Sequence, residues 1–189
     1  MKALKEIGLR KAIKFAYCTI LLILFKWLLF PQLRAVFLRL VGSKVGKNVI
    51  IHDITFFNCY RVGFRGLEIG NDCFIGDDSL IDLAGQVILA DQVTLAERVT
   101  MLTHTNIGYE DHPLQKYYPS FTKSIVIKEG SFIGVNATIM PGVTIGPCSV
   151  IAAGSVVTES IEPYTVVGGV PAKVIKVLPK PENISVKTD

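Results

Sequence analysis

The chain has 189 residues, of which 50% are hydrophobic and 19% are charged. The charged fraction lies below the roughly 25% of an ordinary soluble domain, and the high hydrophobic fraction excludes an intrinsically disordered chain. The length suits one domain with a sizeable core. The net charge of +4 is uneven, because residues 1–47 carry ten basic side chains against Glu6 alone, whereas residues 48–189 carry ten basic and fifteen acidic ones. This asymmetry predicts that only the N-terminal part contacts an anionic surface.

Residues 1–44 are predicted to form a basic, apolar, helical head. Five basic side chains precede an apolar run over residues 15–25, which Lys26 interrupts and residues 27–30 extend. A membrane span needs about 20 predominantly apolar residues, so this run is short for one. It also lacks the small-residue cleavage site that follows the apolar stretch of a signal peptide.

Bulky apolar side chains beside Lys and Arg favour a head that lies in the interface of an anionic membrane. We therefore expect a cytoplasmic protein that is peripherally associated with the inner face of the cell membrane. A helix packed on the body or on a partner subunit, and a true span, are the alternatives. No nucleic-acid partner is predicted, because the cations alternate with apolar runs rather than with polar residues.

From residue 45 onward, an aliphatic residue recurs every six positions. The residue after each one is often small or acidic, and Val, Ser, Ala or Cys often lies four positions after it. A six-residue period is not helical, and the turn dipeptides of antiparallel hairpins are missing, so short strands separated by tight turns are predicted. Such coils stack into a parallel β-helix, with small corner residues and glycine supplying positive φ where required. The aliphatic positions are Val45, Ile51, Phe57, Ile69, Ile75, Ile81, Leu89, Leu95, Met101, Ile127, Ile133, Ile139, Ile145, Ile151 and Val157.

The repeat is interrupted most strongly between Met101 and Ile127. This gap is about one coil longer than uninterrupted stacking needs, which predicts a protruding loop over residues 106–124. The loop is rich in Tyr and carries both signs of charge, as suits a loop that binds a polar ring or closes over a neighbour's site. A solvated loop without a role is the alternative.

His104 lies just before this loop. An imidazole titrates near neutrality and can take a proton from a hydroxyl as that oxygen attacks a thioester carbonyl. Counting along the repeat places His104 above Ala84 and Asp82 beneath Leu102. Asp82 is therefore expected to point outward near the imidazole, where it orients the ring or bonds a sugar hydroxyl. A structural histidine and an ordinary corner acid are the alternatives.

The repeat resembles that of the hexapeptide-repeat acyltransferases over residues 45–178. The most specific segments are residues 131–158, SFIGVNATIMPGVTIGPCSVIAAGSVVT, and 164–176, YTVVGGVPAKVIK. They look like the galactoside, maltose and nodulation O-acetyltransferase branch. The resemblance implies a mainly β fold, a left-handed parallel β-helix of triangular section with an N-terminal helical extension and a C-terminal tail at 179–189. It further implies homotrimers with active sites between subunits and acetyl-CoA as the co-substrate.

The resemblance also assigns roles to individual residues. The family's catalytic histidine lies in this coil just before this loop, and His104 matches it. The family's substrate-binding asparagine corresponds to Asp77 or Asp78, and His112 within the loop is expected to help bind the substrate. Gly134 is small enough to line a groove for a pantetheine arm. The family positions that contact coenzyme A match Ala153, Thr158, Lys173 and Lys176 in this sequence.

A carbonic anhydrase-like branch of the fold binds zinc through three histidines. His52, His104 and His112 lack the spaced pair of that branch, so no metal is expected. The predicted function is transfer of an acetyl group from acetyl-CoA to a saccharide hydroxyl, on a membrane-linked glycan or its precursor, with His104 as general base. An amino-sugar N-acetyltransferase is one alternative. A non-catalytic scaffold is the other, because Glu159 and the acid at the substrate position depart from the family pattern.

Overall fold

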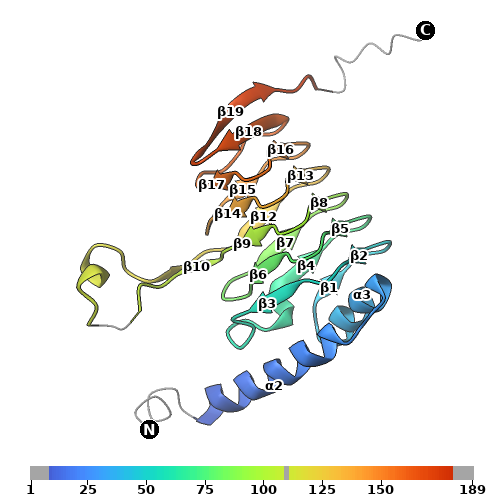
Figure 1. Cartoon of the computed structure of the whole chain (residues 1–189), viewed down its shortest axis with the longest axis vertical. Helices are drawn as coiled ribbons and strands as arrows, with labels where there is room; N and C mark the ends of the chain where they lie inside the picture. Colours follow the sequence, from blue (N-terminus) through green and yellow to red (C-terminus); the bar gives the residue numbers. More distant parts are fainter. Residues whose placement is uncertain (1–8, 109–110, 181–189) are drawn as a thin grey trace.

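The computed structural model describes residues 9–108 and 111–180. Two helices precede a three-sided prism of short parallel strands, and a two-stranded arm projects from its side (Figure 1). The helices are α2 (Leu9–Lys26) and α3 (Pro31–Leu40). The first eight residues of the predicted head, and the predicted tail beyond residue 180, lie outside the described residues.

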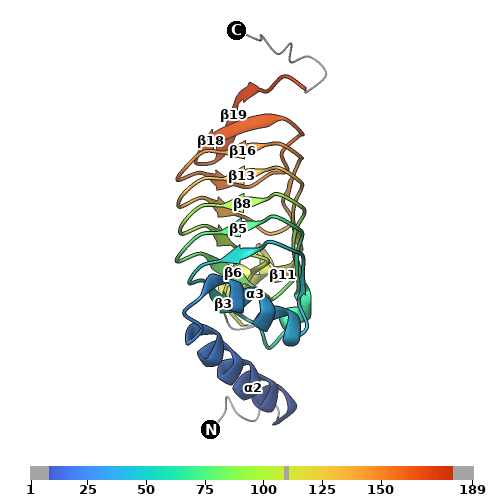
Figure 2. The same cartoon turned by 90° about the vertical axis from the view of Figure 1, so that its right-hand side faces the viewer.

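The chain passes through three walls in turn, and each complete turn adds one strand to each wall (Figure 2). The first wall contains β1 (Lys44–Val45), β4 (Leu67–Ile69), β7 (Val87–Leu89), β12 (Ile125–Ile127) and β15 (Thr144–Ile145). The second contains β2 (Ile50–Ile51), β5 (Phe74–Ile75), β8 (Thr94–Leu95), β13 (Phe132–Ile133), β16 (Val150–Ile151), β18 (Thr165–Gly169) and the antiparallel β19 (Ala172–Val177). The third contains β3 (Thr55–Phe57), β6 (Leu80–Asp82), β9 (Thr100–Met101), β14 (Thr138–Ile139) and β17 (Val156–Val157). This is the parallel β-helix that the repeat predicted, of the left-handed type that the family resemblance implied.

The aliphatic positions of the repeat form the core. From Ile69 to Val157 every one of them is at least 97% buried, and neighbours stack in register, as Ile75 does between Ile51 and Leu95. The prediction is wrong by one residue at Phe57. Phe56 is buried there and pairs with Ile81, while Phe57 pairs with Asp82. In a strand, a slip of one residue turns each side chain to the opposite face.

The residues after the core positions are small because the next coil approaches them closely, whereas the sequence had suggested that they allow the chain to turn. A side chain added at Gly134 would put its Cβ 2.7 Å from the backbone nitrogen of Ala153 in the next coil, and one at Gly76 would lie 2.7 Å from Ala96 C. These glycines therefore permit close approach of the coils. The positive φ values occur two residues later, for example at Asp78 and Asn136.

The cysteines are free thiols. Cys18, Cys59 and Cys73 are buried, as expected of small hydrophobic side chains, whereas Cys148 is half-buried. Cys148 occupies one of the corner positions with positive φ.

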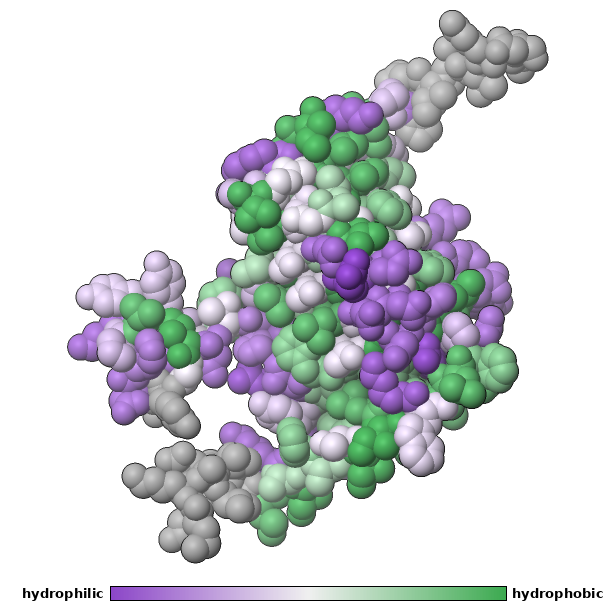
Figure 3. All heavy atoms as spheres, viewed as in Figure 1, coloured by the Kyte–Doolittle hydropathy of each residue, from purple (hydrophilic) through white to green (hydrophobic). Residues whose placement is uncertain are grey.

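The two helices cover the N-terminal end of the prism. Phe25 at the end of α2 is buried against Phe56 and Phe37, with ring centroids 5.5 and 5.9 Å away, and Lys26 forms a 2.6 Å ion pair with Asp53. Within residues 9–108 and 111–180, no helix is both long and apolar enough to cross a bilayer. Apolar side chains nevertheless gather on the outside of this region (Figure 3), and the exposed ones on α2 and just after it are Leu9, Ile13, Phe15, Tyr17, Ile20, Ile23, Leu24, Trp27, Leu29 and Phe30.

Candidate active site

His104 lies at the base of the arm, where the chain leaves the third wall. It begins β10 (His104–Thr105), which pairs in antiparallel fashion with β11 (Phe121–Thr122), so that His104 lies opposite Thr122. The arm also contains the short 3-10 helix η2 (Pro113–Lys116). β10 therefore lies just before the segment predicted as a protruding loop and β11 lies near its end, so that the paired strands fix the backbone on both sides of the arm. Two-residue strands carry no periodic signal, which is why the sequence did not indicate them.

The imidazole of His104 forms a hydrogen bond through Nδ1 with Asp82 Oδ2. Asp82 ends β6, one coil below, and its side chain is 0% exposed, whereas 20% of the His104 side chain is exposed. The expected register is confirmed, because Ile81 of β6 pairs with Met101 of β9 and the two segments continue side by side. The structure places Asp82 against the imidazole as expected, but the Asp82 side chain is fully buried. Its carboxylate lies against the imidazole and is not accessible to an acceptor sugar.

The carboxylate of Asp82 is saturated with hydrogen bonds. Asn58 Nδ2 and the amide of Ala84 donate to Oδ1 at 2.8 and 3.0 Å, and the amide of Thr103 donates to Oδ2 at 2.9 Å. The Thr103 hydroxyl lies 3.0 Å from the same oxygen and accepts from the amide of Gly85 at 2.8 Å. A buried charge is tolerated only with such partners, so this cluster holds the carboxylate in one position.

The balance of these contacts keeps Asp82 ionised. Burial alone would raise its pKa, but the hydrogen bonds from Asn58, His104, Ala84 and Thr103 outweigh burial and hold the pKa below its ordinary value. An ionised carboxylate only accepts hydrogen bonds, so Nδ1 of His104 carries the proton. The other ring nitrogen, Nε2, then has the free electron pair. The pair is thus arranged for His104 to act as a general base, with Asp82 as the positioning residue.

The other candidate acceptor contacts lie elsewhere in this chain. Asp77 is at the corner between the second and third walls, where its carboxylate accepts from the Asp53 amide at 3.0 Å and lies 3.0 Å from His52 Nδ1. The Asp53 hydrogen bond, followed by that of His52, lowers the pKa of Asp77. His112 precedes η2, and its Nδ1 accepts from the Leu114 amide at 3.2 Å, so one ring nitrogen caps that short helix.

The candidate donor residues are on the coils beyond β9. Ala153 follows β16, Thr158 follows β17, and Lys173 and Lys176 are on β19; all four are exposed. The register pairs Lys173 with Gly168 and Lys176 with Val166, two residues apart on β18, so both lysines belong to one face of this ribbon. Gly134 is buried instead, and the close approach of the next coil accounts for it.

Asn58 and Thr103 were missed by the sequence analysis. Neither has a residue type or spacing that marks it, although Asn58 has a positive φ of 56°, which asparagine adopts more readily than most residues. Their role emerges only when β3, β6 and β9 stack. Among the described residues, no group of three His, Cys, Asp or Glu side chains is arranged to hold a metal ion.

Comparison with known proteins shows which proteins this chain resembles. A family model described as bacterial transferase hexapeptide (six repeats) matches residues 124–159. Galactoside O-acetyltransferase from Escherichia coli K12 is 46% identical over 65 residues, which are 34% of this chain and 32% of that protein. The aligned part therefore spans about a third of that relative.

Solved structures match over nearly the whole chain. A maltose O-acetyltransferase from Clostridium difficile 630 superposes with a TM-score of 0.77 and 29% identity, covering 92% of this chain and 90% of the other. A hexapeptide-repeat acetyltransferase from Vibrio cholerae, in complex with acetyl coenzyme A, gives a TM-score of 0.75 with 26% identity and 89% coverage of both chains. The chain is therefore similar to the hexapeptide-repeat transferases within residues 124–159, and over nearly its whole length it shares the fold of a maltose O-acetyltransferase.

Proposed function

We propose that this protein transfers an acetyl group from acetyl-CoA to a saccharide hydroxyl, with His104 as the general base. The observation that carries the proposal is the hydrogen bond between His104 Nδ1 and the buried Asp82 carboxylate, which leaves Nε2 as the basic nitrogen of the neutral ring. The relatives named as O-acetyltransferases support the reaction class, and the structure complexed with acetyl coenzyme A supports the donor.

His104 has two tasks in this reaction. Its Nε2 removes the proton of the acceptor hydroxyl as the oxygen attacks the thioester carbonyl, and Asp82 stabilises the resulting imidazolium. When the carbon–sulfur bond breaks, the imidazolium returns the proton to the departing thiolate. The products are an acetyl ester and free coenzyme A, and His104 regains its starting tautomer. Backbone amides around the arm are suited to stabilise the oxyanion.

The exposed candidate donor residues fit coenzyme A. Ala153 and Gly154 form an exposed corner, and a Cβ added to Gly154 would meet nothing within 4 Å, so the backbone there is open to an extended pantetheine arm. Lys173 and Lys176, on the neighbouring β18–β19 ribbon, supply cations for the phosphate groups of coenzyme A.

We propose a homotrimer as the active unit. His104 follows the third wall, whereas Asp77 and Ala153 lie at the corner between the second and third walls, so one chain does not bring the donor, acceptor and base residues together. Packing the corner of one prism against a wall of another would complete the site. Sedimentation equilibrium should give three times the chain mass, and an active monomer would overturn this arrangement.

We further propose that residues 1–44 attach the acyltransferase domain, residues 45–178, to an anionic membrane surface at the cytoplasmic face. The exposed apolar side chains of α2 and the basic residues between them support an interfacial position. The protein should sediment with vesicles containing anionic lipid and less with zwitterionic ones, with the difference reduced by salt.

The reaction itself is tested by the release of thiol from acetyl-CoA in the presence of a panel of saccharide acceptors. We expect release that depends on both substrates, together with a mass increase of one acetyl group on the acceptor. Isothermal titration with coenzyme A supplies an independent readout. Absence of binding at millimolar coenzyme A would overturn the enzymatic proposal and favour a scaffold.

A further inference from the structure

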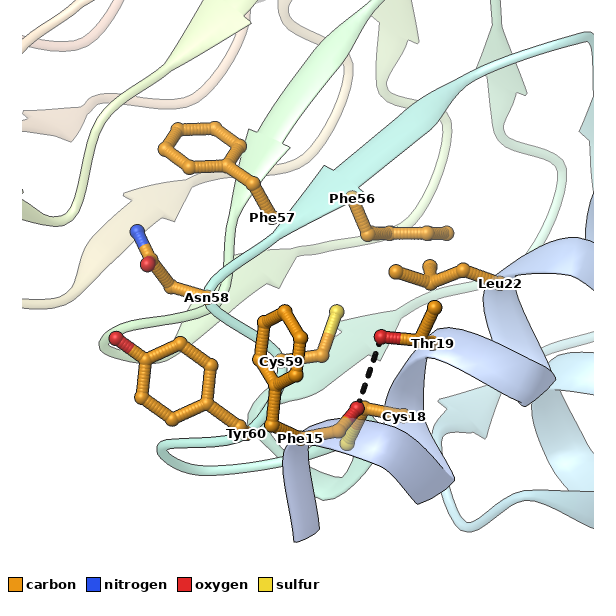
Figure 4. Close-up of a pocket in the computed structure, with 9 residues that line it drawn as sticks. All are labelled: Phe15, Cys18, Thr19, Leu22, Phe56, Phe57, Asn58, Cys59 and Tyr60. Atoms are coloured by element: carbon orange, nitrogen blue, oxygen red, sulfur yellow. Dashed lines mark hydrogen bonds between the residues drawn. The ribbon is translucent and has the colours of Figure 1, made fainter. Parts of the chain in front are cut away.

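An apolar cleft lies between α2 and the end of β3, next to the candidate active site. Its volume is about 300 Å³, and it is lined on the helix side by Phe15, Cys18, Thr19 and Leu22, and on the prism side by residues 56–60 (Figure 4). Helix packing and core formation leave this space open although most of its walls are hydrophobic. Clefts of this size accommodate small ligands or part of a larger one.

The walls of the cleft are uncharged at neutral pH. Burial raises the pKa of the Cys59 thiol to about 12 and also raises the pKa of Cys18, so both remain neutral thiols, which behave as small hydrophobic groups. Phe15 and Tyr60 make an edge-to-face contact at one end, with ring centroids 5.8 Å apart. The interior therefore suits a hydrocarbon chain rather than a sugar.

Two residues that line the cleft also lie close to the His104–Asp82 pair. Asn58 lines it and donates the 2.8 Å hydrogen bond to Asp82 Oδ1. Phe57 also lines it, and the centroid of its ring lies 6.5 Å from that of His104. A chain in the cleft would therefore lie beside two residues that border the His104–Asp82 pair.

Two cationic residues adjoin the cleft in sequence, Lys14 before Phe15 and Arg61 after Tyr60, and Arg61 also reaches the arm. Lys14 on α2 donates to the carbonyl oxygen of Arg61 at 2.7 Å, and the Arg61 guanidinium lies 3.5 Å from the hydroxyl of Thr122, which pairs with His104. Both cationic side chains are exposed. An amphiphile with an anionic group at the end of its chain would match this succession of apolar and basic surfaces.

The position of the cleft along the prism assigns it to the acceptor. The third wall runs in the order β3, β6, β9, β14, β17, and His104 follows β9. The cleft is at β3, toward the N-terminal end. The exposed candidate donor residues follow β16 and β17 or lie on β19, toward the C-terminal end, so base and thioester approach the acceptor from the other side.

We propose that the acceptor is a saccharide carried on a lipid phosphate, with its hydrocarbon chain in the α2–β3 cleft, its phosphate at Lys14 and Arg61, and the reacting hydroxyl at His104. This inference rests on the proposed acetyl transfer and specifies its substrate class. It also explains the exposed apolar face of α2, because a helix in the membrane interface places the cleft at the depth of the lipid hydrocarbon chains.

Binding of dodecyl phosphate and butyl phosphate, both below micellar concentration, tests the cleft without any assay of transfer. Wild-type protein should bind the longer chain at least tenfold more tightly. Thr19→Trp and Leu22→Trp fill the cleft and should abolish this preference, whereas Thr19→Val, which leaves its volume almost unchanged, should retain it. Two fillers are used so that a folding defect in one does not decide the result, and thermal unfolding checks both. Equal binding of both chains by the wild type, or an unchanged preference in correctly folded fillers, would overturn the proposal.

Two further measurements separate the parts of the proposal. Arg61→Gln should weaken dodecyl phosphate several-fold and leave dodecyl maltoside, which has no charge, unaffected; equal effects on both would remove the phosphate contact. Acetyl transfer to dodecyl glycosides should exceed transfer to methyl glycosides, and Thr19→Trp should equalise them. If the cleft binds the chain but no glycoside is acetylated, the proposed function fails while the binding result stands. If Thr19→Trp instead removes a preference for long acyl-CoA, the cleft belongs to the donor and the inference is wrong.

Discussion

Within residues 9–108 and 111–180, two histidine–aspartate pairs lie in contrasting surroundings. In both, Nδ1 of the imidazole faces Oδ2 of an aspartate one coil away. The His52–Asp77 pair is on an open corner with 34% and 53% of its side chains exposed, whereas His104 and Asp82 are 20% and 0% exposed. Residue types alone therefore do not define the site.

The difference lies in what surrounds each carboxylate. Asp82 is enclosed by donors from three coils, including Asn58 and Thr103, and cannot exchange its partners for water. Asp77 has the backbone amide of Asp53 and the ring of His52, and water reaches the rest. An enclosed carboxylate fixes both the tautomer and the direction of the imidazole, while a solvated pair is weak and is screened by salt.

The largest effect is expected from removing the base itself. His104→Ala should lower kcat by about 10³- to 10⁴-fold, because general-base catalysis is lost. His52→Ala is the matched control and should leave kcat within a few-fold of wild type. The measurement is thiol release from acetyl-CoA with a saccharide acceptor. Equal losses in both variants would show that the contrast between the two pairs has no catalytic meaning.

A smaller loss is expected from replacing the carboxylate of either pair. Asp82→Asn should reduce kcat by about 10²-fold, because an amide no longer fixes Nδ1 as the protonated nitrogen. The pH–rate profile of this variant should also change on its acid side, which a merely structural loss would not cause. Asp77→Asn should alter KM for the acceptor more than kcat. A kcat unchanged in Asp82→Asn would contradict the positioning role.

The smallest effect concerns stability in acid. The folded-state pKa of Asp82 is lowered, so its ionisation stabilises the fold above the unfolded-state value near 3.8, and this contribution disappears as the pH falls through the folded-state pKa. The free energy of unfolding should therefore fall more steeply below about pH 4 in wild type than in Asp82→Asn. Asp77→Asn should change that slope less, because Asp77 is exposed. Urea titrations between pH 2.5 and 6 provide the comparison, and identical slopes in all three proteins would exclude the effect.

The β-helix and its core were predictable from the sequence because a period of six residues defines the geometry of each coil. Ile133, Ile139 and Ile145 each occupy the inner side of a different wall, and their spacing determines both the strand length and the stacking. The interruption before Ile127 likewise located the arm. The exception at Phe57 falls outside the regular region, where a slip of one residue leaves no trace in composition.

The sequence by itself determined the coil, its core and the coil that bears His104, since these follow from a repeated pattern of local residue choices. Only the tertiary structure decided that Asp82 is fully buried beside His104, that Asn58 and Thr103 complete its hydrogen bonds, and that α2 leaves a cleft against β3. Each of these depends on which side chains from separate coils meet. Such contacts are set by the stacking of the coils and the docking of the helix, and the repeat of six residues does not specify them.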